Sequence, residues 1–158
     1  PGTAHRLFGA LREEGISVIL ISQGSSEHSI CCAIPQREGE RAAMVIRRAF
    51  ERELLEGHIQ NVEIDPDLAI LAIVGDGMAG TPGVAAKVFN ALGGSGVNVR
   101  AIAQGASERN ISVVIEGRST TRALRAAHAG LYLSAHTLSV GIIGPGTVGR
   151  VLLDQIAS

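Results

Sequence analysis

The chain carries two copies of one segment. Residues 1–34 and 82–115 align without a gap at an offset of 81 residues, and 15 of the 34 aligned positions are identical. Average residue usage predicts about two or three identities by chance. The best-matched stretches read GISVILISQGSSEHSICCAI from Gly15 and GVNVRAIAQGASERNISVVI from Gly96. This self-similarity predicts a duplicated supersecondary unit.

The second copy indicates the order of elements within a unit. Residues 68–75 are apolar and rich in β-branched side chains, which predicts a buried strand. After a glycine-rich loop, Thr81 and Pro82 suit the N-cap and first turn of a helix. Apolar residues recur on one helix face over 85–92, and the glycines at 93–96 end that helix. Further elements are predicted as strands at 97–103 and 111–116, a helix from Ser119 to about Leu131, and a strand at 137–143.

The first copy predicts the same elements without the first strand, which we expect to precede Pro1 in a longer protein. Its predicted elements are a helix over 4–11, strands at 16–22 and 29–34, a second helix that ends at Gly57, and a strand over 59–64. The order βαββαβ is that of a ferredoxin-like α+β sandwich. We therefore predict two such units, over residues 1–66 and 67–139.

A third pattern occupies residues 140–158. A short apolar run precedes Gly144, Gly146 and Gly149, and a helical stretch, RVLLDQIA, follows them. Strand, G-x-G-x-x-G and helix in this order are typical of the first turn of a Rossmann domain, where the glycines approach a pyrophosphate. The acidic residue expected about 20 positions later is absent, so these glycines predict an incomplete cofactor site in a truncated Rossmann segment.

Composition excludes several partners. The chain has 14 Lys and Arg against 15 Asp and Glu, a net charge of -1. Because nucleic acids and anionic membrane surfaces attract a basic excess, we expect neither as a partner. No apolar run reaches the roughly 18 residues that a membrane span needs, so we expect a cytoplasmic protein.

Nothing in the sequence indicates catalysis or metal binding. The only cysteines, Cys31 and Cys32, are adjacent, which excludes a C-x-x-C site. The five histidines have no metal-ligand spacing, and we find neither a phosphate-loop motif nor a local Ser-His-Asp pattern. We therefore predict no catalytic residue and no metal site. The histidines are His5, His28, His58, His128 and His136.

The paired segments LISQGSSEHSI and AIAQGASERNI, each behind a helix that begins PG-x-A, resemble the tandem ACT domains of aspartokinases. The tail VGIIGPGTVGRVLLDQI resembles the start of homoserine dehydrogenase. Together they resemble the region that joins the two enzymes in bifunctional aspartokinase/homoserine dehydrogenase. In aspartokinases one ACT unit is nested within the other, so strand partners need not follow sequence order.

The resemblance implies a regulatory role. The ACT pair of the family binds an end-product amino acid, typically threonine in the fused enzymes, and inhibits the kinase. Equivalent ACT units pair side by side, which implies a homo-oligomer, with a dimer expected. The resemblance implies ATP with Mg²⁺ and NAD(P) as cofactors of the parent enzyme, and none for this chain.

Seven residues are predicted to contact the effector. A primary amide both donates and accepts hydrogen bonds, which suits an amino-acid zwitterion, and helix N-termini offer free N–H groups to its carboxylate. The resemblance adds that the two glutamines contact threonine in the plant-type fused enzymes. The candidates are Gly2, Ala4, Gln23, Gly83, Ala85, Asn98 and Gln104.

Each candidate has a structural alternative. The glycines would be ordinary helix starts, the glutamines would cap loop amides, and Asn98 would lie on a solvated sheet face. Asp76, Ser26-Glu27 and Ser107-Glu108 are weaker candidates, since turn formation alone explains them. For the whole chain, the alternatives to a regulatory sensor are a ligand-free dimerisation module and a small NAD-dependent dehydrogenase.

Overall fold

The computed structural model describes residues 2–23 and 29–132. The strands are β1 (Leu20–Gln23), β2 (Ile30–Ala33), β3 (Leu68–Val74), β4 (Val99–Gln104) and β5 (Asn110–Glu116). The helices are α1 (Thr3–Glu13), α2 (Gly39–Ala49), α3 (Glu51–Leu55), α4 (Val84–Gly94) and α5 (Thr120–Tyr132). Single 3-10 turns, η1 (Gln36–Glu38), η2 (Asp76–Met78) and η3 (Gly117–Ser119), precede α2, α4 and α5. The predicted α+β fold is confirmed.

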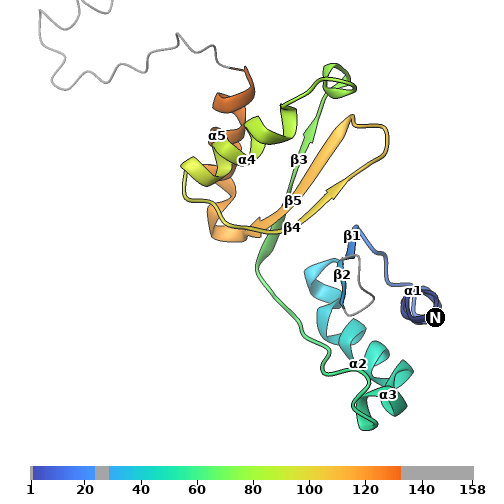
Figure 1. Ribbon diagram of the computed structural model, residues 1–158. Coiled ribbons are helices and arrows are strands. Elements are labelled where there is room, and N and C mark those ends of the chain that lie inside the picture. The colour runs from blue at the N-terminus through green and yellow to red at the C-terminus, as the bar shows by residue number, and fades with distance from the viewer. Residues whose placement is uncertain (1, 24–28, 133–158) are drawn as a thin grey trace, which may run out of the picture.

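The second unit forms an antiparallel sheet in the order β3-β5-β4, with α4 and α5 packed together on one face (Figure 1). The register places Leu71 opposite Val113, which in turn lies opposite Ile102 of β4. A register shift between Val99 and Ala101 marks a bulge near the start of β4. The central strand β5 therefore carries the core of this unit.

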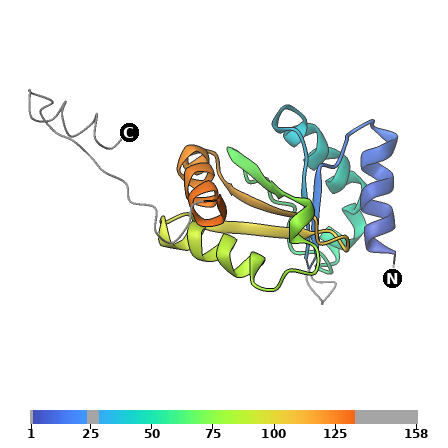
Figure 2. The ribbon, with the colours of Figure 1, turned by 90° about the horizontal axis from the view of Figure 1, so that it is seen from above.

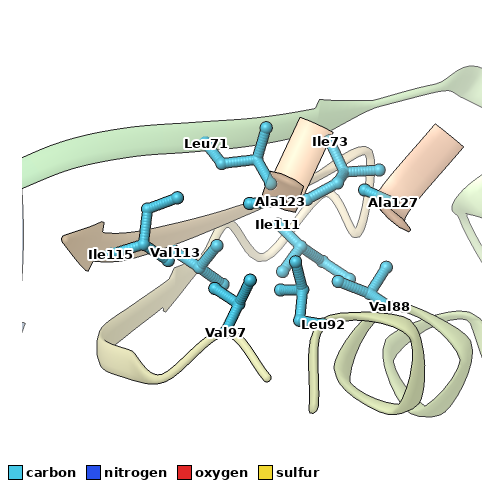
Figure 3. Close-up of a cluster of buried hydrophobic side chains, with 10 residues drawn as sticks. All are labelled: Leu71, Ile73, Val88, Leu92, Val97, Ile111, Val113, Ile115, Ala123 and Ala127. Atoms are coloured by element: carbon cyan, nitrogen blue, oxygen red, sulfur yellow. The ribbon is translucent and has the colours of Figure 1, made fainter. Parts of the chain in front are cut away.

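Ten side chains from these strands and helices form the larger core (Figure 3). Val88, Leu92, Val113 and Ile115 are fully buried. Val88 and Leu92 lie four residues apart in α4, as the predicted apolar helix face requires. The cluster comprises Leu71, Ile73, Val88, Leu92, Val97, Ile111, Val113, Ile115, Ala123 and Ala127.

The first unit is smaller. Strands β1 and β2 pair antiparallel from Leu20↔Ala33 to Gln23↔Ile30, and α1 packs on α2. A buried cluster of Leu11, Ile16 and Ala42 holds these elements together. The Arg6 guanidinium lies 4.5 Å from the Phe50 ring centroid and pairs with Glu53 of α3. That hydrogen bond from Arg6 lowers the pKa of the Glu53 carboxyl.

Three predictions for the first unit are wrong, one of them entirely and two in part. Residues 59–64 do not form the predicted strand, because their backbone groups have other partners. The Val62 carbonyl accepts a hydrogen bond from Arg47 at 2.8 Å, and the Val62 N–H donates to the Asn61 side chain. The predicted strand 16–22 begins only at Leu20. The helix predicted to end at Gly57 is interrupted at the buried Phe50 and ends at Leu55.

The two units meet at β1 and β4, which lie side by side in both ribbon views (Figures 1 and 2). The Ser22 hydroxyl donates to the carbonyl of Ile102 at 3.2 Å. The connecting segment adds the ion pair between Asp65 and Arg100 and a hydrogen bond from Gln36 to Asp67 at 3.2 Å. Strand β1 of the first copy is thereby held against its counterpart in the second copy.

Several predicted features lie outside the described residues. They are the strand at 137–143, the 140–158 segment, and its glycines Gly144, Gly146 and Gly149. Within the part that the structure describes, no helix is long and apolar enough to cross a membrane. The domain boundaries at 66 and 139 stay predictions.

Candidate functional site

Gln23 and Gln104 occupy equivalent positions, as the last residues of β1 and β4. Gln23 lies opposite Ile30 and Gln104 opposite Ile111 in their hairpins, and both glutamines are exposed. Gln23 directly follows Ser22, whose hydroxyl bonds to Ile102, two residues before Gln104. The structure therefore brings both predicted amides to the junction of the two units.

The N-terminus of α4 lies at the same end of the second sheet as Gln104. Gly83 is the N-cap, with φ 85°, a left-handed conformation that favours glycine. A Cβ there would meet nothing within 4 Å, so backbone conformation and not space requires the glycine. No side chain caps this end, which leaves N–H groups around Ala85 available to a ligand.

The predicted N-cap is therefore wrong. The Thr81 hydroxyl donates instead to the Gly77 carbonyl at 2.8 Å, and the helix begins at Val84. The side chain that was expected to cap the helix is used to close the preceding loop.

Glu108 and Asp76 have partners within the protein. The Glu108 carboxylate accepts from the Gly80 N–H at 2.8 Å, which ties the turn after β4 to the loop before α4. Asp76 lies 3.7 Å from the Arg109 guanidinium. These contacts favour the structural alternative for both acids, and they explain how the Gln104 end of β4 is kept beside the α4 N-terminus. Glu27 and Ser26 lie outside the described residues.

Gly2 and Ala4 lie at the start of α1, where Gly2 is a left-handed N-cap with φ 90°. In both ribbon views α1 lies beyond β1 as seen from β4 (Figures 1 and 2). No hydrogen bond between described residues joins this helix end to Gln23 or Gln104. The hydrogen bonds of the described residues thus give no direct link between these two candidates and the glutamines.

Asn98 precedes β4 and is not part of the strand as predicted. Its side chain is exposed, as is that of Ser17 at the equivalent position of the first copy. The strand starts one residue later, at Val99. Asn98 therefore lies at the opposite end of β4 from Gln104.

Ser22 was missed by sequence reasoning. It differs from Ala103 at the equivalent repeat position, and this difference within an otherwise matched strand was the available signal. Among the described residues no cluster of His, Cys, Asp or Glu could hold a metal ion. Burial raises the pKa of the Cys32 thiol, while Cys31 on the other strand face is exposed.

The sequence model of the ACT domain matches residues 1–50 and 71–131 of the chain. The chain belongs to the ACT domain family. The first unit, α1-β1-β2-α2-α3, and the second unit, β3-α4-β4-β5-α5, meet at β1 and β4 and are its tandem ACT units, as the resemblance predicted.

The chain is similar to regions of larger enzymes. It is 52% identical, over 99% of its own length, to 17% of bifunctional aspartokinase/homoserine dehydrogenase 1 from Arabidopsis thaliana. It is 40% identical, over 98% of its length, to 19% of bifunctional aspartokinase/homoserine dehydrogenase from Haemophilus influenzae. The chain therefore spans about a sixth of the length of these curated relatives.

Solved structures agree with this assignment. The ligand-free regulatory subunit of aspartate kinase from Thermus thermophilus has a TM-score of 0.68 and 37% identity, with 84% of each chain covered. Aspartate kinase from Clostridium acetobutylicum has a TM-score of 0.73 and 28% identity, covering 84% of this chain and 30% of that one. The Arabidopsis relative is described as chloroplastic, and the expectation of a cytoplasmic protein stays a prediction.

Proposed function

We propose that this ACT pair is the allosteric region through which an end-product amino acid, threonine, feedback-inhibits aspartate kinase and homoserine dehydrogenase in one chain. The observation that carries the proposal is the contact between β1 and β4, which places Gln23 and Gln104 at one junction. A ligand at a junction between units can bias how the units pack, because it favours the arrangement to which it binds more tightly.

The chemistry of the junction suits a small zwitterion. Backbone N–H groups at Gly83 and Ala85, at the positive end of the α4 dipole, would bind the carboxylate. The amides of Gln23 and Gln104 would bind the ammonium and the side-chain hydroxyl. Catalysis belongs to the surrounding protein, with ATP and Mg²⁺ for the kinase and NAD(P) for the dehydrogenase.

Calorimetric titration of the chain tests the proposal. Threonine is expected to bind, whereas lysine and methionine are expected to bind at least tenfold more weakly, because neither side chain offers a hydroxyl to the amides of Gln23 and Gln104. A thermal scan provides the second readout, since saturation to 100 Kd adds about 2.7 kcal/mol to the free energy of unfolding. Equal binding of all three amino acids, or of none, would contradict the threonine assignment.

We also propose that the chain self-associates. The sheet face opposite α4 and α5 exposes Ile70 and Val74, and the exposed fractions of these side chains are 37% and 67%. Apolar patches and open strand edges of this kind are covered by partners. Light scattering is expected to give a dimer, and a mass of 16.4 kDa, that of one chain, at every concentration would show the opposite.

A further inference from the structure

An open hollow of about 790 Å³ lies between the end of α4 and the first half of α5, away from the β1–β4 junction. Its polar lining consists of three arginines and two hydroxyl side chains, without a carboxylate. Residues 117–132, which include η3 and α5, contain no Asp or Glu. The lining residues are Ser95, Arg118, Thr121, Arg122, Arg125 and Ala126.

Comparison with the first copy of the repeat shows that Arg122 lacks acidic partners. At the repeat offset, Arg122 corresponds to Arg41, which pairs with Glu38 at 3.0 Å and with Glu14 at 3.6 Å. The positions of those two acids are occupied by Ser119 and Ser95 in the second copy. The substitution removes two negative charges and two bulky side chains beside a retained arginine.

Glu116 is the one carboxylate that pairs with a lining arginine among the described residues, so it compensates only part of the positive charge. Arg118 donates to Glu116 at 2.7 Å, whereas Arg122 bonds to the neutral Ser119 hydroxyl at 3.1 Å. No ion pair among the described residues involves Arg122 or Arg125. The hydrogen bond and charge of Arg118, with the charges of Arg100 and Arg122, lower the pKa of the Glu116 carboxyl, so that acid is ionised at neutral pH. Three lining arginines against one carboxylate leave an excess charge of about two.

We propose that this hollow binds a small phosphate-bearing anion where the first copy has Glu14 and Glu38. A phosphate group carries about two negative charges near neutral pH and matches the excess. Guanidinium groups bind phosphate oxygens through paired hydrogen bonds, and the Thr121 hydroxyl adds a further donor. The hollow lies within the usual size range of ligand pockets.

Titration of the chain with pyrophosphate, at about 0.15 M ionic strength, tests this site. Arg122→Ala is expected to weaken binding roughly tenfold to hundredfold, since it removes charged hydrogen bonds. Arg41→Ala is the matched control at the equivalent position and is expected to leave the affinity unchanged. Circular dichroism checks that each variant is folded.

Ser95→Glu provides a second variant that keeps every arginine. It restores the acid of the first copy. The new carboxylate is expected to pair with the Arg122 guanidinium, as Glu14 pairs with Arg41, and thereby to weaken pyrophosphate binding at least tenfold. Absence of binding to the wild-type chain would overturn the proposal. The arginines would then be assigned to contacts with an acidic surface of the surrounding protein. Equal losses in Arg122→Ala and Arg41→Ala, or preference for succinate over pyrophosphate, would also overturn it.

Discussion

Leu92→Ala is expected to lower the free energy of unfolding by about 2–5 kcal/mol, the usual cost of a large-to-small change in a core. Leu92 has no exposed surface and lies in the cluster between α4 and the sheet (Figure 3). The cost has two parts, because the lost methyl groups return to water in the unfolded state and a cavity remains in the folded one. Urea unfolding followed by circular dichroism measures the change.

Leu124→Ala in α5 is the matched control. The side chain of Leu124 is 58% exposed, so the same substitution is expected to change the free energy of unfolding by less than about 0.5 kcal/mol. Similar losses at Leu92 and Leu124 would show that the described core does not stabilise the second unit.

Gln23→Ala and Gln104→Ala together are expected to abolish measurable threonine binding. Each change removes a hydrogen bond to a charged ligand group, which typically costs about 1.5–3 kcal/mol, or roughly tenfold to hundredfold in affinity. If both amides contact one ligand, the double variant loses up to about 10⁴-fold when the terms add. Both side chains are exposed, so the apo free energy of unfolding should change little.

Gln60→Ala is the control for this pair, because Gln60 is also exposed but lies in the segment that connects the units. It is expected to leave the threonine titration unchanged. Undiminished threonine binding by the double variant would exclude the glutamines as ligand contacts, whereas loss from one single variant alone would assign the site to that copy.

Local patterns predicted the elements whose core-facing residues repeat regularly. The apolar spacing over 85–92 located α4, and the β-branched runs located β3 and β5, because each pattern reports burial directly. The segment 59–64 also looked apolar enough for a strand. The backbone groups of Val62 instead form hydrogen bonds with the side chains of Arg47 and Asn61. The periodicity of apolar residues does not report such a hydrogen bond to a side chain from another element.

The candidate site was predictable in part for the same reason. Repetition of Gln-Gly at equivalent strand ends identified Gln23 and Gln104 as positions worth testing, but not that β1 and β4 would be neighbours. The left-handed Gly83 cap and the Glu108–Gly80 bond depend on loop conformation, which has no periodic signal. The arginine hollow depends on the packing of α5 against the end of α4, which no local sequence pattern reports.

The Ser22 bond across β1 and β4 has a consequence for how this junction can evolve. In a dimer of identical units, any substitution at the junction appears twice, and both halves change together. Here the halves are covalently linked copies, so β1 carries a serine where β4 has Ala103. One half can thus specialise while the other keeps its original contacts, and each glutamine can gain or lose a role on its own.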